Sequence, residues 1–191
     1  MHKYCRYWHL PTQLFPLKGV NPYENADLFA VVREPFDRLL SEYYYICRRE
    51  VTVHWNFIDC NRTRTQEPEY MNEWIRDKLE QIPPGRLAPT DFLNFNGHYT
   101  PQSQFLISYP SQIRMVDYVL RLENLATEFN ALMKAYGISA EILAHRKNTA
   151  RNGTKGDLDA SHFDAKTLTL FHERYVDDME IYNRKVKSLR I

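Results

Sequence analysis

An arginine, a proline and a serine follow a short apolar run early in the chain, and together they could bind a phosphate group. The run covers residues 28–32, and Arg33 comes directly after it, with Pro35 two residues later and Ser41 eight residues after Arg33. A guanidinium offers a permanent charge and a planar set of donors that fit phosphate oxygens. The start of a helix at Pro35 adds unpaired amides and a favourable dipole. The pattern predicts an anion site with Arg33 and Ser41 as ligands, whereas Arg38 fits a surface or structural cation better; a salt bridge is the alternative for Arg33.

A second group of basic residues stands later in the chain. Arg146, Lys147 and Arg151 concentrate positive charge in a segment that contains Gly153. A glycine lets the backbone approach a phosphate closely, and successive amides can bind an anion. The segment therefore indicates a second anion-binding loop, and the alternative is a solvated basic loop.

The elements that must position Arg33 form a strand-turn-helix unit. The apolar run at 28–32 is typical of a parallel strand that is buried on both faces. The helix that begins at Pro35 has an apolar stripe at helical spacing, made of Phe36, Leu39, Leu40, Tyr43 and Tyr44. In an open parallel sheet, ligands bind beyond the carboxyl ends of the strands, which is where Arg33 stands.

The rest of the chain continues the alternation of strands and helices. We expect a helix around residues 70–80, a turn entering a helix at 98–105, and a second buried strand at 116–120 followed by a loop at 121–124. A further helix presents Leu125, Phe129, Leu132 and Met133, with Gly137 as its C-cap, and a final helix runs from 164 to about 186 with Leu168, Phe171, Tyr175, Met179 and Tyr182 inward. Strands that alternate with helices predict a three-layer α/β fold with a central parallel sheet.

Length and charge limit the classes of protein to consider. The 191 residues are enough for one domain, residues 1–191, with one substantial core. Because 25 basic and 24 acidic residues nearly cancel, no global field would hold the chain on nucleic acid or an anionic membrane. No apolar run is long enough to span a bilayer, so the chain as given is expected to be soluble. The cysteines Cys5, Cys47 and Cys60 have no metal spacing, and an odd number cannot pair fully within one chain.

Several segments resemble the sulfotransferases that use 3′-phosphoadenosine 5′-phosphosulfate. The segment FAVVREPFDRLLSEYYY resembles their 3′-phosphate-binding segment, in which a strand leads to Arg-x-Pro, then Arg, Ser and Tyr. VDYVLRLENL resembles their strand ending in Glu-x-Leu, and TEFNALMKAYG resembles the helix after it. Residues 151–157 are similar to the Arg-Lys-Gly-x-x-Gly loop of the cytosolic members, with Asn152 in place of Lys. TLTLFHERYVDDMEIYN resembles the C-terminal helix of the Golgi carbohydrate members, and the likeness covers residues 28–186.

The resemblance implies roles for the residues above. Arg33 and Ser41 would hold the 3′-phosphate, Arg151 and Gly153 would contact the nucleotide, and Arg146 would serve the nucleotide or an acidic sugar. The implied fold is P-loop-like, with 3′-phosphoadenosine 5′-phosphosulfate as co-substrate and no metal. Family members also carry an N-terminal strand, a Lys- or Arg-containing loop and a helix that bind the 5′-phosphosulfate. The sequence has no Gly-x-x-x-x-Gly-Lys-Ser/Thr, so we expect this unit, and any membrane anchor, in a missing N-terminal segment or another chain.

Sulfuryl transfer requires a base that removes the proton of the acceptor, which is typically worth about 10²- to 10⁴-fold in rate. His9 lies where some Golgi members place a catalytic histidine and is the first candidate. His98, in Gly-His-Tyr-Thr-Pro-Gln, is the second. For either, the alternative is a partly buried histidine bonded to backbone. Glu123 is expected to brace the end of the sheet or the nucleotide loop.

The likeness to Golgi members favours a carbohydrate hydroxyl or amine as acceptor and the Golgi lumen as location. A nucleotide-binding remnant without activity is the alternative, and a P-loop kinase would need the Walker sequence that is absent from the printed chain. Two triplets, Asn61-Arg62-Thr63 and Asn152-Gly153-Thr154, are glycosylation acceptors if the chain meets the secretory lumen. Such triplets also arise often by chance.

Overall fold

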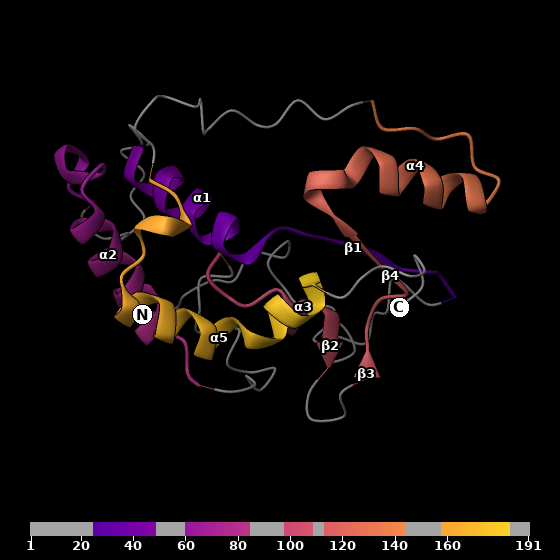
Figure 1. The fold of residues 1–191 in the computed structure, drawn as a ribbon. Helices are drawn as coiled ribbons and strands as arrows, with labels where there is room; N and C mark the ends of the chain where they lie inside the picture. Colours follow the sequence, from indigo (N-terminus) through magenta and orange to yellow (C-terminus); the bar gives the residue numbers. More distant parts are fainter. Residues whose placement is uncertain (1–24, 49–59, 85–97, 109–112, 144–157, 184–191) are drawn as a thin grey trace, which may run out of the picture.

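The computed structural model describes residues 25–48, 60–84, 98–108, 113–143 and 158–183. The α-helices in this part of the chain are α1 (Pro35–Arg48), α2 (Pro68–Glu80), α3 (Ser103–Leu106), α4 (Leu125–Ala135) and α5 (Ala165–Asn183). The strands are β1 (Phe29–Val32), β2 (Ile107–Ser108), β3 (Ile113–Arg114) and β4 (Tyr118–Arg121). Helices α1, α2 and α5 pack together, whereas α4 lies apart from them beside β4 (Figure 1).

Strands β1 and β4 form a parallel pair, and β2 and β3 form an antiparallel pair. In the parallel pair Phe29 lies opposite Tyr118 and Val32 opposite Arg121, so both strands end at the same edge. The expectation that residues 28–32 are buried on both faces is wrong, because Phe29 and Val31 are 44% and 41% exposed. The cause is incomplete cover: α4 contacts this face only in part, with the Phe129 ring against the edge of Phe29 at 5.8 Å between centroids.

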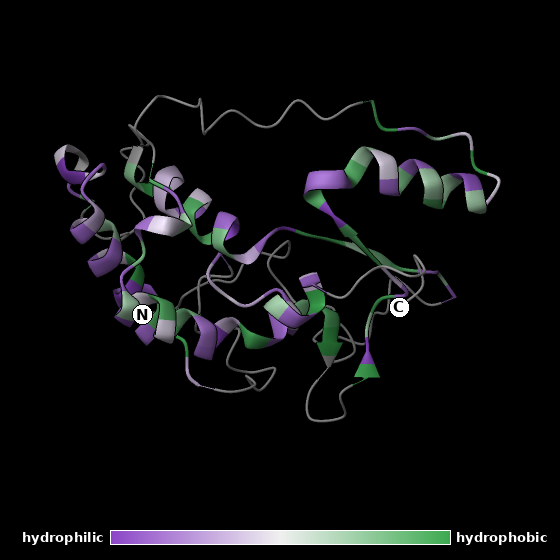
Figure 2. Cartoon of the chain, in the orientation of Figure 1, coloured by the Kyte–Doolittle hydropathy of each residue, from purple (hydrophilic) through white to green (hydrophobic). Residues whose placement is uncertain are grey.

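The main core lies between α1, α2 and α5. The expected apolar stripe of α1 turns inward, and the fully buried side chains that meet there include Leu40, Tyr43, Tyr44, Met71, Ile75, Leu79, Phe171 and Tyr175. Two phenolic hydroxyls of this core have backbone partners: Tyr43 donates to the Thr65 carbonyl and Tyr44 to the Leu158 carbonyl. Figure 2 shows both hydrophilic and hydrophobic residues on these helices, as the amphipathic pattern predicts.

Helix α5 is the long final helix that the sequence predicts, with Phe171 and Tyr175 buried against α1. The helix is interrupted at Tyr175, whose φ of −119° and ψ of 21° are not helical. After this kink the helix reaches a second, smaller core around β1 and β4. There Ile181 and Tyr182 pack against a cluster made of Val32, Leu106, Val116 and Val119. One helix therefore joins the two cores.

Helix α4 ends as its sequence predicts. Gly137 has a φ of +68°, which non-glycine residues rarely adopt. Its amide donates to the Lys134 carbonyl, and the Ile138 amide donates to the Met133 carbonyl. These two bonds are the Schellman arrangement that closes a helix C-terminus.

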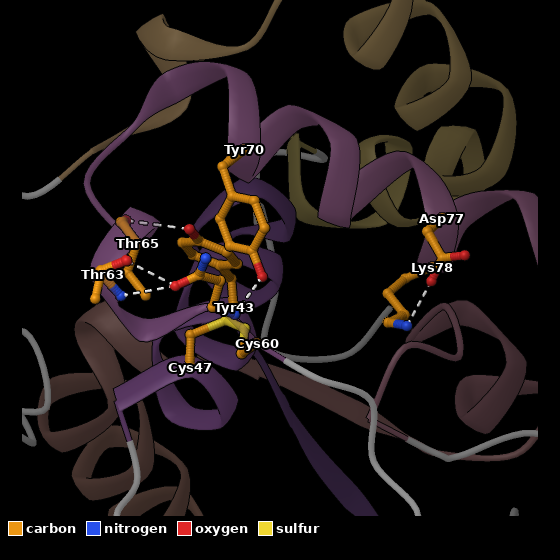
Figure 3. Close-up of a disulfide and its surroundings, with 9 residues drawn as sticks. Tyr43, Cys47, Cys60, Thr63, Thr65, Tyr70, Asp77 and Lys78 are labelled. Carbon is orange, nitrogen blue, oxygen red and sulfur yellow. Dashed lines mark hydrogen bonds and ion pairs between the residues drawn. A yellow bond between two sulfur atoms is a disulfide. The ribbon is translucent and has the colours of Figure 1, made fainter.

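A disulfide between Cys47 and Cys60 joins the end of α1 to the segment before α2 (Figure 3). The sequence left the pairing of its three cysteines open, and Cys5 lies outside the described residues. The two cysteines are 13 residues apart in the chain, so the bond closes a short loop next to the main core. It fixes the end of the helix that carries Ser41.

The small parallel sheet with helices around it agrees with the α/β class that the sequence predicts. Helices at 35, 70–80 and 164 onward, and the segment entering α3, stand where expected, and α2 begins at Pro68, in the first turn where proline is tolerated. The strand expected at 116–120 is β4, followed by the 3-10 helix η6 (Leu122–Asn124). A wider, three-layer sheet stays a prediction.

Candidate functional site at the end of the parallel strands

Arg33 and Glu34 follow β1 at the edge where β4 also ends. The backbone of Arg33 is fixed by the side-chain amide of Gln102, 69 residues away in the sequence. The Arg33 amide donates to Gln102 Oε1 at 2.9 Å, and Gln102 Nε2 donates to the Arg33 carbonyl at 2.9 Å. This pair of bonds is the pairing that a neighbouring strand would make. It sets the direction in which the chain leaves β1.

The side chains of Arg33 and Ser41 are both half-buried. Neither forms a hydrogen bond or ion pair with another of the described residues. Arg38, by contrast, acts on buried groups of α5: its charge lowers the pKa values of Tyr175 and Asp178, against the effect of burial. The sequence-based assignment of Arg38 as a structural cation is therefore consistent with the structure, and the Arg33 guanidinium has donors available for an anion.

The N-terminus of α1 differs from the expectation. Glu34 precedes Pro35 and caps the helix, since its carboxylate accepts from the Asp37 amide at 2.6 Å. Burial raises the pKa of Glu34, and the backbone amides of Asp37 and Phe36 partly oppose that rise. The prediction that the first amides of this helix are unpaired and open to an anion is wrong, because a carboxylate of the chain itself already binds them.

Glu123, in the 3-10 helix η6 that follows β4, braces this edge. Its Oε1 accepts the Glu34 amide at 3.1 Å and its Oε2 accepts the Tyr182 hydroxyl at 3.2 Å. Burial and the charge of Glu123 raise the pKa of Tyr182 to about 12. These contacts join the ends of β1, β4 and α5, as the sequence-based role of Glu123 requires.

Arg121, the last residue of β4, pairs with Glu128 of α4. The carboxylate of Glu128 accepts from the Arg121 amide at 2.6 Å and from the guanidinium at 2.9 Å. Because the Glu128 carboxylate binds both the backbone and the side chain of Arg121, the Arg121 side chain is held in one orientation. This ion pair fixes the end of β4 against α4.

The segment from His98 to Ser103 crosses from the strand edge to α1, and α5 holds it in place. Asp178, which is 2% exposed, accepts the amides of Gln102 and Ser103 at 2.7 Å each. The Tyr175 hydroxyl donates to the Tyr99 carbonyl at 2.5 Å. Burial raises the pKa of Asp178, while the charge of Arg38 and the two amides lower it. Asp178 and Tyr175 thus position Gln102, and through it Arg33.

His98 lies at the other end of this segment and contacts α1. Its Nδ1 is 3.1 Å from Oε2 of Glu42, the residue after Ser41. The imidazole ring also stacks on Tyr45, with 6.4 Å between centroids and 18° between planes. The side chain of His98 is 35% exposed and that of Glu42 is 13% exposed. A carboxylate at Nδ1 favours the tautomer with its proton there, which puts the basic lone pair on Nε2.

Four of the residues that the sequence singles out lie outside the described residues, namely His9, Arg146, Arg151 and Gly153. Arg33, Ser41 and His98 lie within the described residues. Gln102 binds the backbone of Arg33, and Glu42, the residue after Ser41, contacts His98. Sequence reasoning did not single out Glu42, Gln102 or Asp178 as site residues. Gln102 belongs to the same segment as His98, and Asp178 belongs to the Tyr-x-x-Asp pattern of the last helix. Neither pattern indicates which distant residue the side chain binds.

Within the described segments, no group of His, Cys, Asp and Glu side chains has a geometry that would hold a metal ion. In the same segments, no helix combines the length and the hydropathy needed to cross a membrane.

One comparison with known proteins supports the resemblance to sulfotransferases. A family model described as "Sulfotransferase family" matches residues 16–184. This match spans most of the chain, including every described element of the site. Searches of curated proteins and of solved structures found no match.

Proposed function

Because the chain belongs to the sulfotransferase family, we propose that it transfers a sulfuryl group from 3′-phosphoadenosine 5′-phosphosulfate to a hydroxyl, or an amine, of a carbohydrate. One observation carries the proposal. Arg33 stands at the carboxyl end of a parallel strand with its backbone fixed by Gln102, and its guanidinium has no hydrogen-bonding partner among the described residues. A half-buried cation held in that way is suited to a phosphate.

In this proposal Arg33 and Ser41 bind the 3′-phosphate of the nucleotide. The guanidinium supplies charge and several donors, and the Ser41 hydroxyl supplies one more. Arg151 and Gly153 would contact the nucleotide from their basic loop, and Arg146 would contact the nucleotide or an acidic sugar. The Glu34 carboxylate beside this site opposes anion binding, so the contribution of Arg33 has to exceed that repulsion.

His98 is our candidate for the base, with Glu42 as the group that orients it. The acceptor hydroxyl would lose its proton to His98 Nε2, and Glu42 at Nδ1 would stabilise the imidazolium that forms. The donor supplies the sulfuryl group: a bond forms from sulfur to the acceptor oxygen as the bond from sulfur to the phosphate oxygen breaks. His9 is the other candidate.

The Cys47–Cys60 disulfide supports a luminal location, since disulfides persist in oxidising compartments. Together with the likeness to Golgi carbohydrate members, it leads us to propose the Golgi lumen.

The nucleotide site can be tested by binding of 3′-phosphoadenosine 5′-phosphate to the purified chain. At a hundredfold excess over the dissociation constant, we expect stabilisation by about 2.7 kcal/mol. Arg33→Ala should abolish this shift, whereas Arg64→Ala, which removes an exposed pair with Glu67, should retain it. A shift that is equal in wild type and Arg33→Ala would overturn the assignment of Arg33.

Catalysis needs a separate experiment, in which sulfate transfer from labelled donor is measured over a panel of glycans. We expect His98→Gln to lower kcat by about 10²-fold or more with little change in nucleotide affinity. If His9→Gln lowers kcat and His98→Gln does not, the base is His9. Nucleotide binding without transfer to any acceptor would favour the inactive remnant, which is the second candidate function.

A further inference from the structure

The turn that precedes α2 carries an asparagine whose surroundings suit a covalent glycan. Asn61, Arg62 and Thr63 form an acceptor triplet, and Asn61 and Thr63 are both exposed. Asn61 caps the 3-10 helix η4 (Arg62–Arg64), where its Oδ1 accepts the Thr63 amide at 3.2 Å and the Thr63 hydroxyl at 2.7 Å. Its backbone amide donates to the Tyr70 hydroxyl at 2.6 Å.

The fold uses the oxygen of this side chain and leaves the nitrogen unused. Asn61 Nδ2 donates no hydrogen bond to another of the described residues. An N-linked sugar replaces one hydrogen on this nitrogen and leaves Oδ1 as an acceptor, so both cap bonds survive the modification. Asn72 gives the contrast: it is buried, and its Nδ2 donates to the carbonyls of Pro68 and His162 at 2.8 Å each.

A second, independent observation concerns the compartment. Cys60, the residue directly before Asn61, forms the disulfide with Cys47. Disulfides form in the same oxidising lumen in which N-linked sugars are added. A chain that acquires this disulfide has therefore been where the triplet can be modified.

We propose that Asn61 is an N-glycosylation site and that the folded protein presents its glycan to solvent. The secretory machinery would transfer an oligosaccharide from a polyprenyl-diphosphate carrier. A bond forms between the sugar C1 and Asn61 Nδ2, the bond from C1 to the diphosphate oxygen breaks, Nδ2 loses a proton, and the carrier diphosphate leaves.

The test uses the full chain behind a cleavable secretory leader, in an Asn152→Gln background so that the other triplet cannot contribute. A glycan-acceptor tag after Ile191 reports entry into the lumen. Enzymatic release of the glycan in water labelled with heavy oxygen, followed by peptide mass spectrometry, then identifies Asn61. We expect modification in this protein and in Thr63→Ser, and none in Asn61→Gln or Thr63→Val.

A non-reducing peptide map gives the second readout, because the glycopeptide should be found linked to the peptide that contains Cys47. A modified tag with an unmodified Asn61 would overturn the proposal. So would a glycan that occurs only on molecules lacking the disulfide, because the folded turn would then exclude it. Neither readout depends on nucleotide binding or sulfate transfer, so this proposal can fail or stand apart from the proposed function.

Discussion

The helical core of α1, α2 and α5 and the strand edge where β1 and β4 end are held together by different interactions. In the helical core the Phe171 ring is fully buried and stacks on Phe36 and Tyr175, with 3.9 and 4.9 Å between centroids. At the strand edge Phe29 and Val31 are partly exposed, and the contacts that fix Arg33 are hydrogen bonds from side chains to distant backbone. The free energy of unfolding should therefore reside mainly in the helical core, and the geometry of the site in a few polar contacts.

The largest effect is expected from Phe171→Ala. Truncating a fully buried phenylalanine removes apolar burial and leaves a cavity, which costs about 3–5 kcal/mol. The matched change at the strand edge, Phe29→Ala, should cost well below that because the side chain is 44% exposed. Urea unfolding of both variants measures the difference. Equal losses in the free energy of unfolding would show that the two regions contribute equally to stability, which contradicts the difference proposed here.

The second effect concerns the disulfide at the border of the helical core. Closing a loop of this length stabilises a protein by about 3 kcal/mol, because the linked unfolded chain has fewer conformations. We expect reductant to lower the urea midpoint of the wild type, with a loss of about 3 kcal/mol in the free energy of unfolding. Reductant should leave the double variant Cys47→Ala/Cys60→Ala unchanged, and Cys5→Ser should behave as the wild type. An unchanged wild-type midpoint would show that the bond contributes nothing.

Gln102→Ala tests whether the contacts of Gln102 fix the position of Arg33 as well as stabilise the fold. Each lost hydrogen bond costs about 0.5–1.5 kcal/mol, so unfolding should become easier by roughly 1–3 kcal/mol. Affinity for 3′-phosphoadenosine 5′-phosphate should also fall, by about tenfold if the displaced Arg33 loses about 1.4 kcal/mol of binding. Calorimetric titration measures that affinity.

The control for this variant is Gln81→Ala at the exposed end of α2, where the side-chain amide binds Asp77 and no other described residue. Gln102→Glu is informative as well, because it keeps an acceptor for the Arg33 amide but places a carboxylate against the Arg33 carbonyl. An affinity that Gln102→Ala leaves intact would contradict the positioning role.

The same division explains what the sequence could predict. The stripe Phe36, Leu39, Leu40, Tyr43 and Tyr44 repeats at helical spacing, so its burial follows from local periodicity. The cap at Gly137 follows from local backbone preference in the same way. Arg33 could be located because a strand-to-helix change is visible within a few residues.

Contacts between distant segments leave no such local signal. The two bonds between Gln102 and Arg33 span 69 residues. The bonds that the Asp178 carboxylate accepts from the amides of Gln102 and Ser103 span 76 and 75 residues. The cap that Glu34 forms on α1 is not predictable for another reason. Ser, Thr, Asp and Asn are the usual N-cap residues, so a glutamate before a proline does not indicate a cap. The exposure of Phe29 depends on how far α4 covers the sheet, which an apolar run does not specify.

The smallest effects are expected from pH, and they should have opposite signs at two aspartates: Asp164, which caps α5, and Asp178, which binds the Gln102 segment that positions the strand edge. At the exposed border of the helical core, Asp164 caps α5 through the Thr167 amide and pairs with Arg76 at 2.6 Å. Partial burial acts to raise its pKa, but these partners together lower it below the ordinary value of 3.8. A lowered pKa in the folded state means that the stabilisation is present above the unfolded value and is lost as pH falls through the folded value. At Asp178 burial raises the pKa, so the stabilisation is present in acid and is lost as pH rises above the ordinary range.

Urea unfolding of the wild type, Asp164→Asn and Asp178→Asn from about pH 3 to about pH 7 tests both signs. The destabilisation by Asp164→Asn should be absent in acid and should grow with pH to about 0.2–1 kcal/mol, the usual value of an exposed ion pair. The destabilisation by Asp178→Asn should instead shrink as pH rises, because the buried carboxylate of the wild type then becomes charged. If the destabilisation by both substitutions grew with pH, the charged form of Asp178 would be stabilised in the folded state. Arg38 and the two amides would then outweigh the effect of burial. The carboxylate that positions the strand edge would then respond to pH as Asp164 does.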